Sequence, residues 1–162
     1  MPPTEQDLEV VVGKLLRAKG LTLAVAESCT GGLIGHRITN VPGSSEYYRG
    51  AITAYAYDVK EKLLQVRPET LTEHGAVSEE TAREMAVGVR RAVEADLGVS
   101  VTGIAGPTGG TPDKPVGLTY VGLDARDAQR IERYIFQGDR RENKARSAEA
   151  ALDLVRRYLE EM

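Results

Sequence analysis

The residues with the most chemical potential lie in one short stretch, Ala24-Val-Ala-Glu-Ser-Cys-Thr-Gly-Gly-Leu33. An apolar run over residues 21–26 leads to its centre and an apolar pattern of helical period follows, which predicts a strand, a tight turn and a helix start. The turn places Ser28, Cys29 and Thr30 near the first N–H groups of the helix, which have no intrahelical acceptor. Those groups and the helix dipole attract negative charge, so the corner predicts a site for a bound phosphate or for charge that develops in a reaction.

Ser28 is the candidate nucleophile of this corner, and a serine hydroxyl needs a base to activate it. The only two histidines are poor candidates, because His36 lies two turns inside the predicted helix and His74 sits in a Glu-His-Gly turn. The Gly-x-Ser-x-Gly pattern of a nucleophile elbow is also absent. A Ser-His-Asp triad is therefore not expected, and helix capping by Ser28 remains an equal alternative to catalysis.

Lysine is the remaining base, and Lys60 stands where a predicted strand passes into a helix. Burial and nearby dipoles depress the pKa of a lysine, and a Ser–Lys dyad is a known variant of the triad. The alternative is that Lys60 is a solvated helix residue. Tyr55, at the end of the same strand, either donates a proton or orients the lysine, or is simply a half-buried strand aromatic.

Cys29 competes with its neighbour Ser28, because thiolates at helix N-termini are activated. No histidine partner is available for it, and buried inert cysteines are common, so Ser28 ranks above it. Cys29 is also the only cysteine of the chain. No intrachain disulfide can form, which fits a reducing compartment.

A second glycine-rich stretch, Thr102-Gly-Ile-Ala-Gly-Pro107, follows another predicted strand and opens the longest loop. Its glycines let backbone N–H groups approach an anion, although it is neither a Walker loop nor a dinucleotide fingerprint. It predicts either a ligand-binding loop or a wide structural turn. Farther on, Arg140 and Arg141 begin the last helix and favour phosphate or carboxylate recognition, or else pair with nearby glutamates on the surface.

The elements that must position these residues alternate between helix and strand over the first two-thirds of the chain. Two adjacent strands and a long helix follow, with Asp139 as a candidate N-cap. We expect a single α/β domain over residues 1–162, with a mixed β-sheet of about five strands covered by helices. The predicted helices are 5–19, 31–40, 59–66, 68–74, 79–95 and 140–160, and the strands are 21–26, 47–57, 97–102, 116–124 and 130–137. The predicted buried stripe of the last helix is Ala145, Ala148, Leu152, Val155 and Leu159.

Composition narrows the class of function. The net charge of −3 does not indicate nucleic-acid binding. No apolar run approaches the roughly 20 residues that cross a bilayer, and the N-terminus lacks the pattern of a signal peptide. No cluster of His, Cys, Asp and Glu has metal-ligand spacing. We expect a cytoplasmic protein with no metal, no nucleic-acid partner and no membrane contact.

Taken together, these stretches resemble the CinA C-terminal domain family, whose enzymatic members are nicotinamide-nucleotide amidohydrolases. The resemblance covers about residues 6–158, with the segments in family order. The matching segments are Ala26-Glu-Ser-Cys-Thr-Gly-Gly32, Val41-Pro-Gly-Ser-Ser45, Arg49-Gly50, Ala54-Tyr55, Lys60, His74-Gly-Ala-Val-Ser-Glu79, Thr102-Gly-Ile-Ala-Gly-Pro107, Lys114-Pro-Val-Gly117 and Gly138-Asp-Arg140.

The resemblance implies hydrolysis of nicotinamide mononucleotide to nicotinic acid mononucleotide and ammonia, without metal or cofactor. It places the family's serine, lysine and tyrosine on Ser28, Lys60 and Tyr55. It further implies a homodimer or larger assembly, and the stand-alone form of the domain. With the two glycine corners, the residues expected to contact this small nucleotide substrate are Cys29, Thr30, Gly31, Gly32, Thr102, Gly103, Ala105, Gly106 and Arg140.

The expected mechanism is acyl transfer, in which neutral Lys60 takes the proton of Ser28 and N–H groups between Cys29 and Gly32 stabilise the oxyanion. Tyr57 departs from the family, which often has a small polar residue there, commonly Asn. Two alternatives stay open: a nucleotide-binding regulatory or partner-binding module without catalysis, and a different small amide or ester as substrate.

Overall fold

Five strands form one mixed sheet in the computed structural model, which describes all residues, 1–162. The strand order is β2-β1-β3-β4-β5, with β2, β1 and β3 parallel and β4 and β5 antiparallel to their neighbours. The strands are β1 (Leu23–Glu27), β2 (Tyr48–Thr53), β3 (Leu97–Gly103), β4 (Leu118–Ala125) and β5 (Gln129–Ile135).

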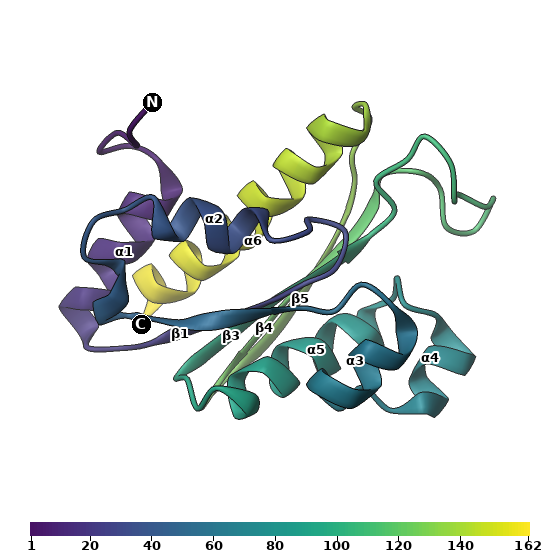
Figure 1. Cartoon of the computed structure of the whole chain (residues 1–162), viewed down its shortest axis with the longest axis horizontal. Coiled ribbons are helices and arrows are strands. Elements are labelled where there is room, and N and C mark those ends of the chain that lie inside the picture. The colour runs from purple at the N-terminus through teal and green to yellow at the C-terminus, as the bar shows by residue number, and fades with distance from the viewer.

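Helices cover both faces of this sheet (Figure 1). On one face lie α1 (Leu8–Lys19), α2 (Leu33–Thr39) and α6 (Arg140–Glu161), and a short 3-10 turn (Ser44–Glu46) leads into β2. On the other face lie α3 (Tyr57–Leu64), α4 (Pro68–His74) and α5 (Glu79–Ala92). No helix is both long and apolar enough to cross a membrane.

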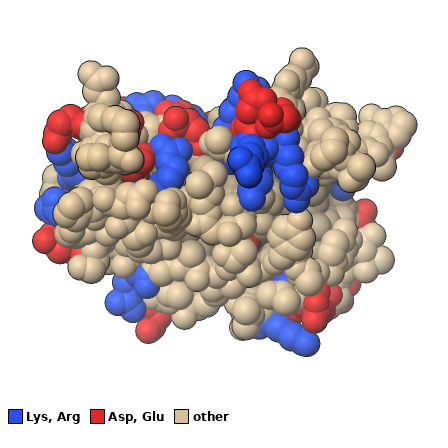
Figure 2. All heavy atoms as spheres, turned by 45° about the horizontal axis from the view of Figure 1, so that its top comes forward, with Lys and Arg blue, Asp and Glu red and all other residues tan.

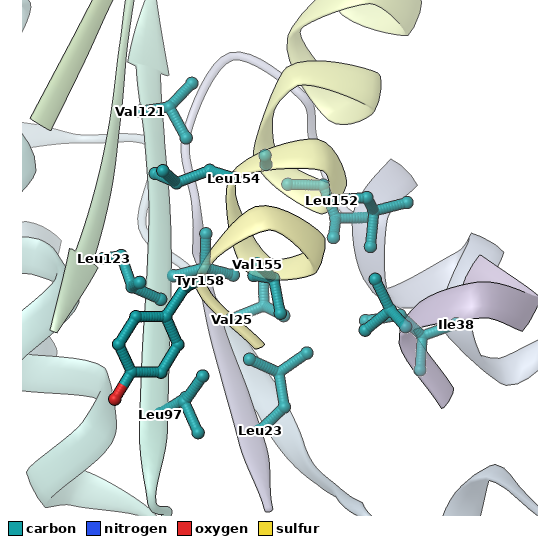
Figure 3. Close-up of a cluster of buried hydrophobic side chains, with 14 of the residues drawn as sticks. Leu23, Val25, Ile38, Leu97, Val121, Leu123, Leu152, Leu154, Val155 and Tyr158 are labelled. Carbon is teal, nitrogen blue, oxygen red and sulfur yellow. The ribbon is translucent and has the colours of Figure 1, made fainter. Parts of the chain in front are cut away.

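The core divides according to the alternation of side chains along the strands. In β1, Leu23 and Val25 point to the α1/α2/α6 layer, while Ala24 and Ala26 point to the α3/α4/α5 layer. Figure 3 shows the first cluster, where Leu152 and Val155 of α6 lie against these strand residues. On the opposite face the strands carry small residues, and α5 packs close to the sheet there: the Ser100 hydroxyl donates to Ala82 O at 2.6 Å.

The predicted α/β class and five-stranded mixed sheet are confirmed, and the element order is as expected. Ser78 caps α5 and Asp139 caps α6, as their positions indicated. Several details were wrong. The first helix begins at Leu8 rather than at residue 5, and α5 ends at Ala92 rather than at residue 95. Tyr57 starts α3 instead of ending β2, and Ala145 is exposed. In the first turns of α6 the buried face contains the polar residues Asn143 and Ser147, because Asn143 bonds to the loop carbonyl of Ala105 and Ser147 lies 3.3 Å from the Thr119 hydroxyl of β4.

The topology brings the candidate residues together. The chain leaves β1 toward β2 on one side and returns to β3 on the other, so the carboxyl ends of these three parallel strands share one edge. Ligands bind at such a switch point in open α/β sheets. The segments that follow the three strands begin at Ser28, Ala54 and Ile104.

Candidate active site

A pocket of about 170 Å³ opens at this edge of the sheet. A larger cavity, of about 730 Å³, lies between α1, α2 and the N-terminal segment, and it contains none of the predicted site residues. The chemistry therefore belongs to the smaller pocket. Its ten lining residues are Ser28, Cys29, Tyr55, Lys60, Ala76, Val77, Thr102, Gly103, Ala105 and Arg140.

Ser28 and Lys60 meet in this pocket, with Lys60 Nζ 3.0 Å from Ser28 Oγ. Ser28 directly follows β1 and its N–H donates to Val101 O, which anchors the residue to β3. Lys60 lies in the first turn of α3 and is 1% exposed, so its aliphatic chain crosses the core to reach the serine. This burial excludes the alternative interpretation, that Lys60 is a solvated residue on the helix surface.

The other contacts of Lys60 determine what its nitrogen can do. Nζ donates to Ala54 O at 2.8 Å and to Tyr55 O at 3.0 Å, and both carbonyls can only accept. A neutral amine has two hydrogens and one lone pair. If both hydrogens go to the carbonyls, the lone pair is left for the third neighbour, the hydroxyl of Ser28. The geometry is therefore that of a base aimed at a nucleophile.

Burial shifts the ionisation of both candidate groups, in opposite senses. It lowers the pKa of Lys60 to about 8, because the ammonium form loses its hydration. It raises the pKa of Cys29 to about 11, because the thiolate would be poorly solvated. The lysine is thus partly neutral near neutral pH while the cysteine stays a thiol. This supports ranking Ser28 above Cys29 as the nucleophile.

The anion at the start of α2 is the chain's own Glu27. This carboxylate is fully buried, and Thr30 Oγ1 donates to its Oε1 at 2.6 Å. The N–H groups of Gly32 and Ile34 also donate to Oε1, and that of Gly35 donates to Oε2 at 3.0 Å. Of the two alternatives for this corner, the bonds to Glu27 disfavour a bound phosphate, because its carboxylate occupies the N–H groups of Gly32, Ile34 and Gly35, and they leave charge that develops in a reaction.

The same bonds limit which N–H groups can stabilise an oxyanion. Of the amides from Cys29 to Gly32, that of Gly31 donates to Ser28 O and that of Gly32 donates to Glu27. The N–H groups of Cys29 and Thr30 make no hydrogen bond within the chain. They are the two donors of the turn that remain free beside the Ser28 hydroxyl.

The second corner, at the end of β3, forms another part of the pocket wall. Thr102 is buried, and its hydroxyl donates to Ala76 O at 2.7 Å. The N–H of Ala76 donates to Tyr57 Oη at 3.3 Å, so hydroxyls hold both backbone polar groups of this wall residue. Gly103 must lack a side chain, because a Cβ there would lie 3.2 Å from Cys29 Sγ and closer still to β4.

Arg140 and Tyr55 lie together at the mouth of the pocket. One Arg140 nitrogen donates to Gly106 O at 2.7 Å, and the other lies 3.5 Å from Tyr55 Oη. Tyr55 is 64% exposed, so it is a solvent-facing aromatic rather than the half-buried strand residue of the alternative. A second cavity, of about 490 Å³, continues from Arg140 past Arg141 and Gly138.

Two arginines, Arg140 and Arg141, line this second cavity together with Asp139. Arg140, Arg141, Lys144 and Arg146 lie close together in the sequence at the start of α6. Figure 2 shows a group of Lys and Arg side chains in the upper middle of one face, with acidic side chains beside it. The small pocket shares Ala105 and Arg140 with this second cavity, so the two adjoin, and we refer to them together as the cleft. The cleft has a nucleophile–base pair at its closed end and cationic side chains at its open end.

Of the predicted site residues, eight line the pocket: Ser28, Cys29, Tyr55, Lys60, Thr102, Gly103, Ala105 and Arg140. Thr30, Gly31, Gly32 and Gly106 do not line it. Sequence reasoning missed two buried polar residues, Glu27 and Asn143. The same feature of the sequence could have identified both. Each is a polar residue at a position where an apolar residue would continue the buried pattern of its strand or helix.

The fold and site define an α/β domain that holds a buried Ser–Lys pair at the carboxyl edge of its sheet. The model of the CinA C-terminal domain matches residues 5–159. The chain therefore belongs to the CinA C-terminal domain family, as the sequence motifs predicted.

Known proteins agree with this assignment. A CinA-like protein of Salinibacter ruber is 54% identical over 152 residues, which are 94% of this chain and 37% of that protein. A CinA superfamily protein of Klebsiella pneumoniae has a TM-score of 0.92 at 31% identity, over 96% of this chain and 97% of that one. The CihA protein of Agrobacterium tumefaciens, described as competence/damage inducible, has a TM-score of 0.87 at 35% identity, over 99% and 98%. The chain spans about 38% of the length of the curated relatives it matches.

Proposed function

We propose that the chain is an amidohydrolase that converts nicotinamide mononucleotide to nicotinic acid mononucleotide and ammonia through an acyl-enzyme on Ser28. The observation that carries the proposal is the environment of Lys60 Nζ, 3.0 Å from Ser28 Oγ, with two carbonyl oxygens taking its other hydrogens. A protein that only binds a nucleotide has no need of a buried base aimed at a serine. The family resemblance supplies the identity of the amide.

In the acylation step, neutral Lys60 takes the hydroxyl proton as Ser28 Oγ bonds to the carboxamide carbon. The positive pyridinium ring makes that carbon more electrophilic. The free N–H groups of Cys29 and Thr30 would stabilise the oxyanion, and one well-placed donor of this kind contributes about 3 kcal/mol. The carbon–nitrogen bond then breaks as Lys60 returns the proton to the leaving nitrogen, which departs as ammonia.

In the deacylation step, water attacks the ester while Lys60 accepts one of its protons. The carbon–oxygen bond to Ser28 breaks, Oγ regains a proton from Lys60, and the product leaves as the carboxylic acid, which loses its proton to solvent to give nicotinate. The same lysine thus serves both half-reactions and ends neutral. No protein group outside the Ser28–Lys60 pair has to supply or remove a proton.

The shape of the cleft supports a nucleotide rather than a free small amide. A pocket of about 170 Å³ is smaller than the roughly 300–1,000 Å³ of a typical ligand site, so it accommodates the carboxamide end and leaves the rest of a nucleotide outside. The adjoining cavity offers Arg140 and Arg141 to an anionic group. We assign the ring to the small pocket and the phosphate to this basic end.

The test compares wild type with Ser28→Ala by measuring ammonia release from nicotinamide mononucleotide and, separately, its binding by calorimetry. We expect Ser28→Ala to abolish ammonia release and to keep the dissociation constant within about threefold, because the hydroxyl contributes little to ground-state binding. Rapid quench of the wild type followed by mass spectrometry is expected to show an acyl adduct on Ser28. Wild-type turnover in Ser28→Ala would exclude the mechanism. Binding without any turnover by the wild type would favour a nucleotide-binding module.

A further inference from the structure

Asn143 joins the two loops that border the basic end of the cleft. It lies in the first turns of α6 and is 2% exposed. Its Nδ2 donates to Ala105 O at 3.0 Å, and its Oδ1 accepts from the N–H of Gly138 at 2.9 Å. One buried side chain therefore ties the glycine loop after β3 to the corner that precedes α6.

The helix itself does not need this side chain. The start of α6 is already closed by a capping box, in which Asp139 Oδ1 accepts from Glu142 N at 2.9 Å and Glu142 Oε1 accepts from Asp139 N at 3.0 Å. Nor does packing require an amide, since a buried polar group costs free energy unless it is fully hydrogen-bonded. The use of an amide here is explained by the two loop contacts.

Those contacts orient the glycine loop. Asn143 holds the carbonyl of Ala105, and Arg140, one helical turn earlier, holds the next carbonyl, that of Gly106, at 2.7 Å. The N–H groups of Ala105 and Gly106 make no hydrogen bond within the chain. In a trans peptide the N–H points opposite to the carbonyl, so fixing Ala105 O also fixes the direction of the Gly106 N–H.

We propose that Asn143 is a positioning residue that sets the affinity for the phosphate-bearing end of the substrate. It does so by aligning the Ala105–Gly106 loop with Arg140, and it touches neither the substrate nor the reacting atoms. This inference rests on the proposed function for the identity of the substrate. According to this proposal, Asn143 affects binding of the phosphate but not the reaction at Ser28, which lies at the other end of the cleft.

The experiment compares Asn143→Ala with wild type on two substrates, nicotinamide mononucleotide and the riboside that lacks the phosphate. We expect KM for the mononucleotide to rise about tenfold, with kcat within about twofold and the parameters for the riboside unchanged. Tyr158→Phe is the matched control. It removes another hydrogen bond of α6, from Tyr158 Oη to Asp127, far along the helix from the site. It is expected to lower stability and to leave both substrates unaffected.

An equal change in KM for the two substrates, or no change in KM for either, would overturn the proposal. Amide hydrogen exchange separates this failure from failure of the proposed function. Asn143→Ala is expected to accelerate exchange at Gly138, Ile104 and Gly117, whose N–H groups hold this loop region, whereas Tyr158→Phe is not. If wild type releases no ammonia, the proposed function fails, and unchanged exchange at these amides would then show that Asn143 does not position the loop.

Discussion

The two glycine corners of this protein follow neighbouring parallel strands, yet they use their backbone in opposite ways. At the end of β1, the chain fills its own helix start with the Glu27 carboxylate, which accepts from three N–H groups and one hydroxyl. At the end of β3, side chains hold the carbonyls of Ala105 and Gly106 and leave the N–H groups unpaired. The first corner fixes its helix start from within and keeps only the Cys29 and Thr30 N–H groups free beside Ser28, whereas the second keeps donors available at the open end of the cleft.

This difference assigns the corners different tasks. A reacting serine must be held in one place, and a buried carboxylate with four donors fixes the turn that contains it. A phosphate site needs unpaired donors and positive charge at a solvent-accessible edge, which the second corner has beside Arg140. We therefore expect variants of the first corner to lower kcat and variants of the second to raise KM.

The largest effect is expected for Lys60→Met. Loss of the base should lower kcat by about 10⁴-fold, because Ser28 would then have no group to accept its proton. The same variant should raise the free energy of unfolding at pH 7 by about 1–3 kcal/mol, because a buried group with a lowered pKa destabilises the fold while it is protonated. Ammonia assays and urea denaturation measure the two effects. A variant that loses both activity and stability would contradict this assignment.

Glu27→Gln tests whether the first corner works by rigidity. The amide keeps the size of the side chain but loses the charge and one acceptor, so we expect kcat to fall about 100-fold and stability to fall by about 2 kcal/mol. KM should change little, because Glu27 does not line the pocket. Glu69→Gln, at an exposed glutamate 3.7 Å from Arg67, is the control and should be neutral. A Glu27→Gln effect on KM alone would remove the distinction between the corners.

Arg140→Lys tests the second corner. Lysine keeps the charge but cannot hold Gly106 O and face Tyr55 with two nitrogens, so we expect KM for the mononucleotide to rise about 10- to 30-fold. The value of kcat should stay within about threefold, and the riboside should react as in wild type. Steady-state kinetics on both substrates is the measurement. A fall in kcat without a change in KM would place Arg140 in the chemistry instead.

The pH dependence follows from the lowered pKa of Lys60, about 8. The base is active when neutral, so kcat/KM should rise about tenfold between pH 7 and pH 9 and then level off. Between about pH 8 and the ordinary lysine pKa of 10.5, the unfolded chain binds more protons than the folded one, so stability should rise with pH in that interval. Lys60→Met should lose this slope. A rate that falls over the same range would mean that the lysine acts as its protonated form.

The smallest effect is expected for Tyr57→Asn. The Tyr57 hydroxyl accepts from the Ala76 N–H at 3.3 Å, and the Thr102 hydroxyl donates to the carbonyl of the same residue. Loss of one of two supports should change KM by about twofold, which corresponds to less than 1 kcal/mol. Tyr57→Phe removes the hydroxyl alone and serves as the comparison. A large fall in kcat in either variant would connect this wall to the first corner.

The pattern of residues was sufficient to predict the α/β class, the strand count and the chemical candidates at both corners. It was sufficient because hydrophobic periodicity, helix capping and the placement of glycines are local properties of the chain. The sequence prediction failed where burial of a residue depends on a partner far along the chain. Ala145 fits the apolar period of the last helix, yet Asn143, which bonds to the loop carbonyl of Ala105, takes the buried position instead.

What the sequence by itself determined was which groups could react: a serine in a tight turn, a lysine after a strand and two corners rich in glycine. Only the tertiary structure decided which of their atoms are free to do so. It buried Lys60 against two carbonyls, used Glu27 to fill the first corner and left the N–H groups of the second unpaired. The physical reason is that a hydrogen bond depends on distance and direction, and the chain sets these only when strands remote in sequence lie side by side.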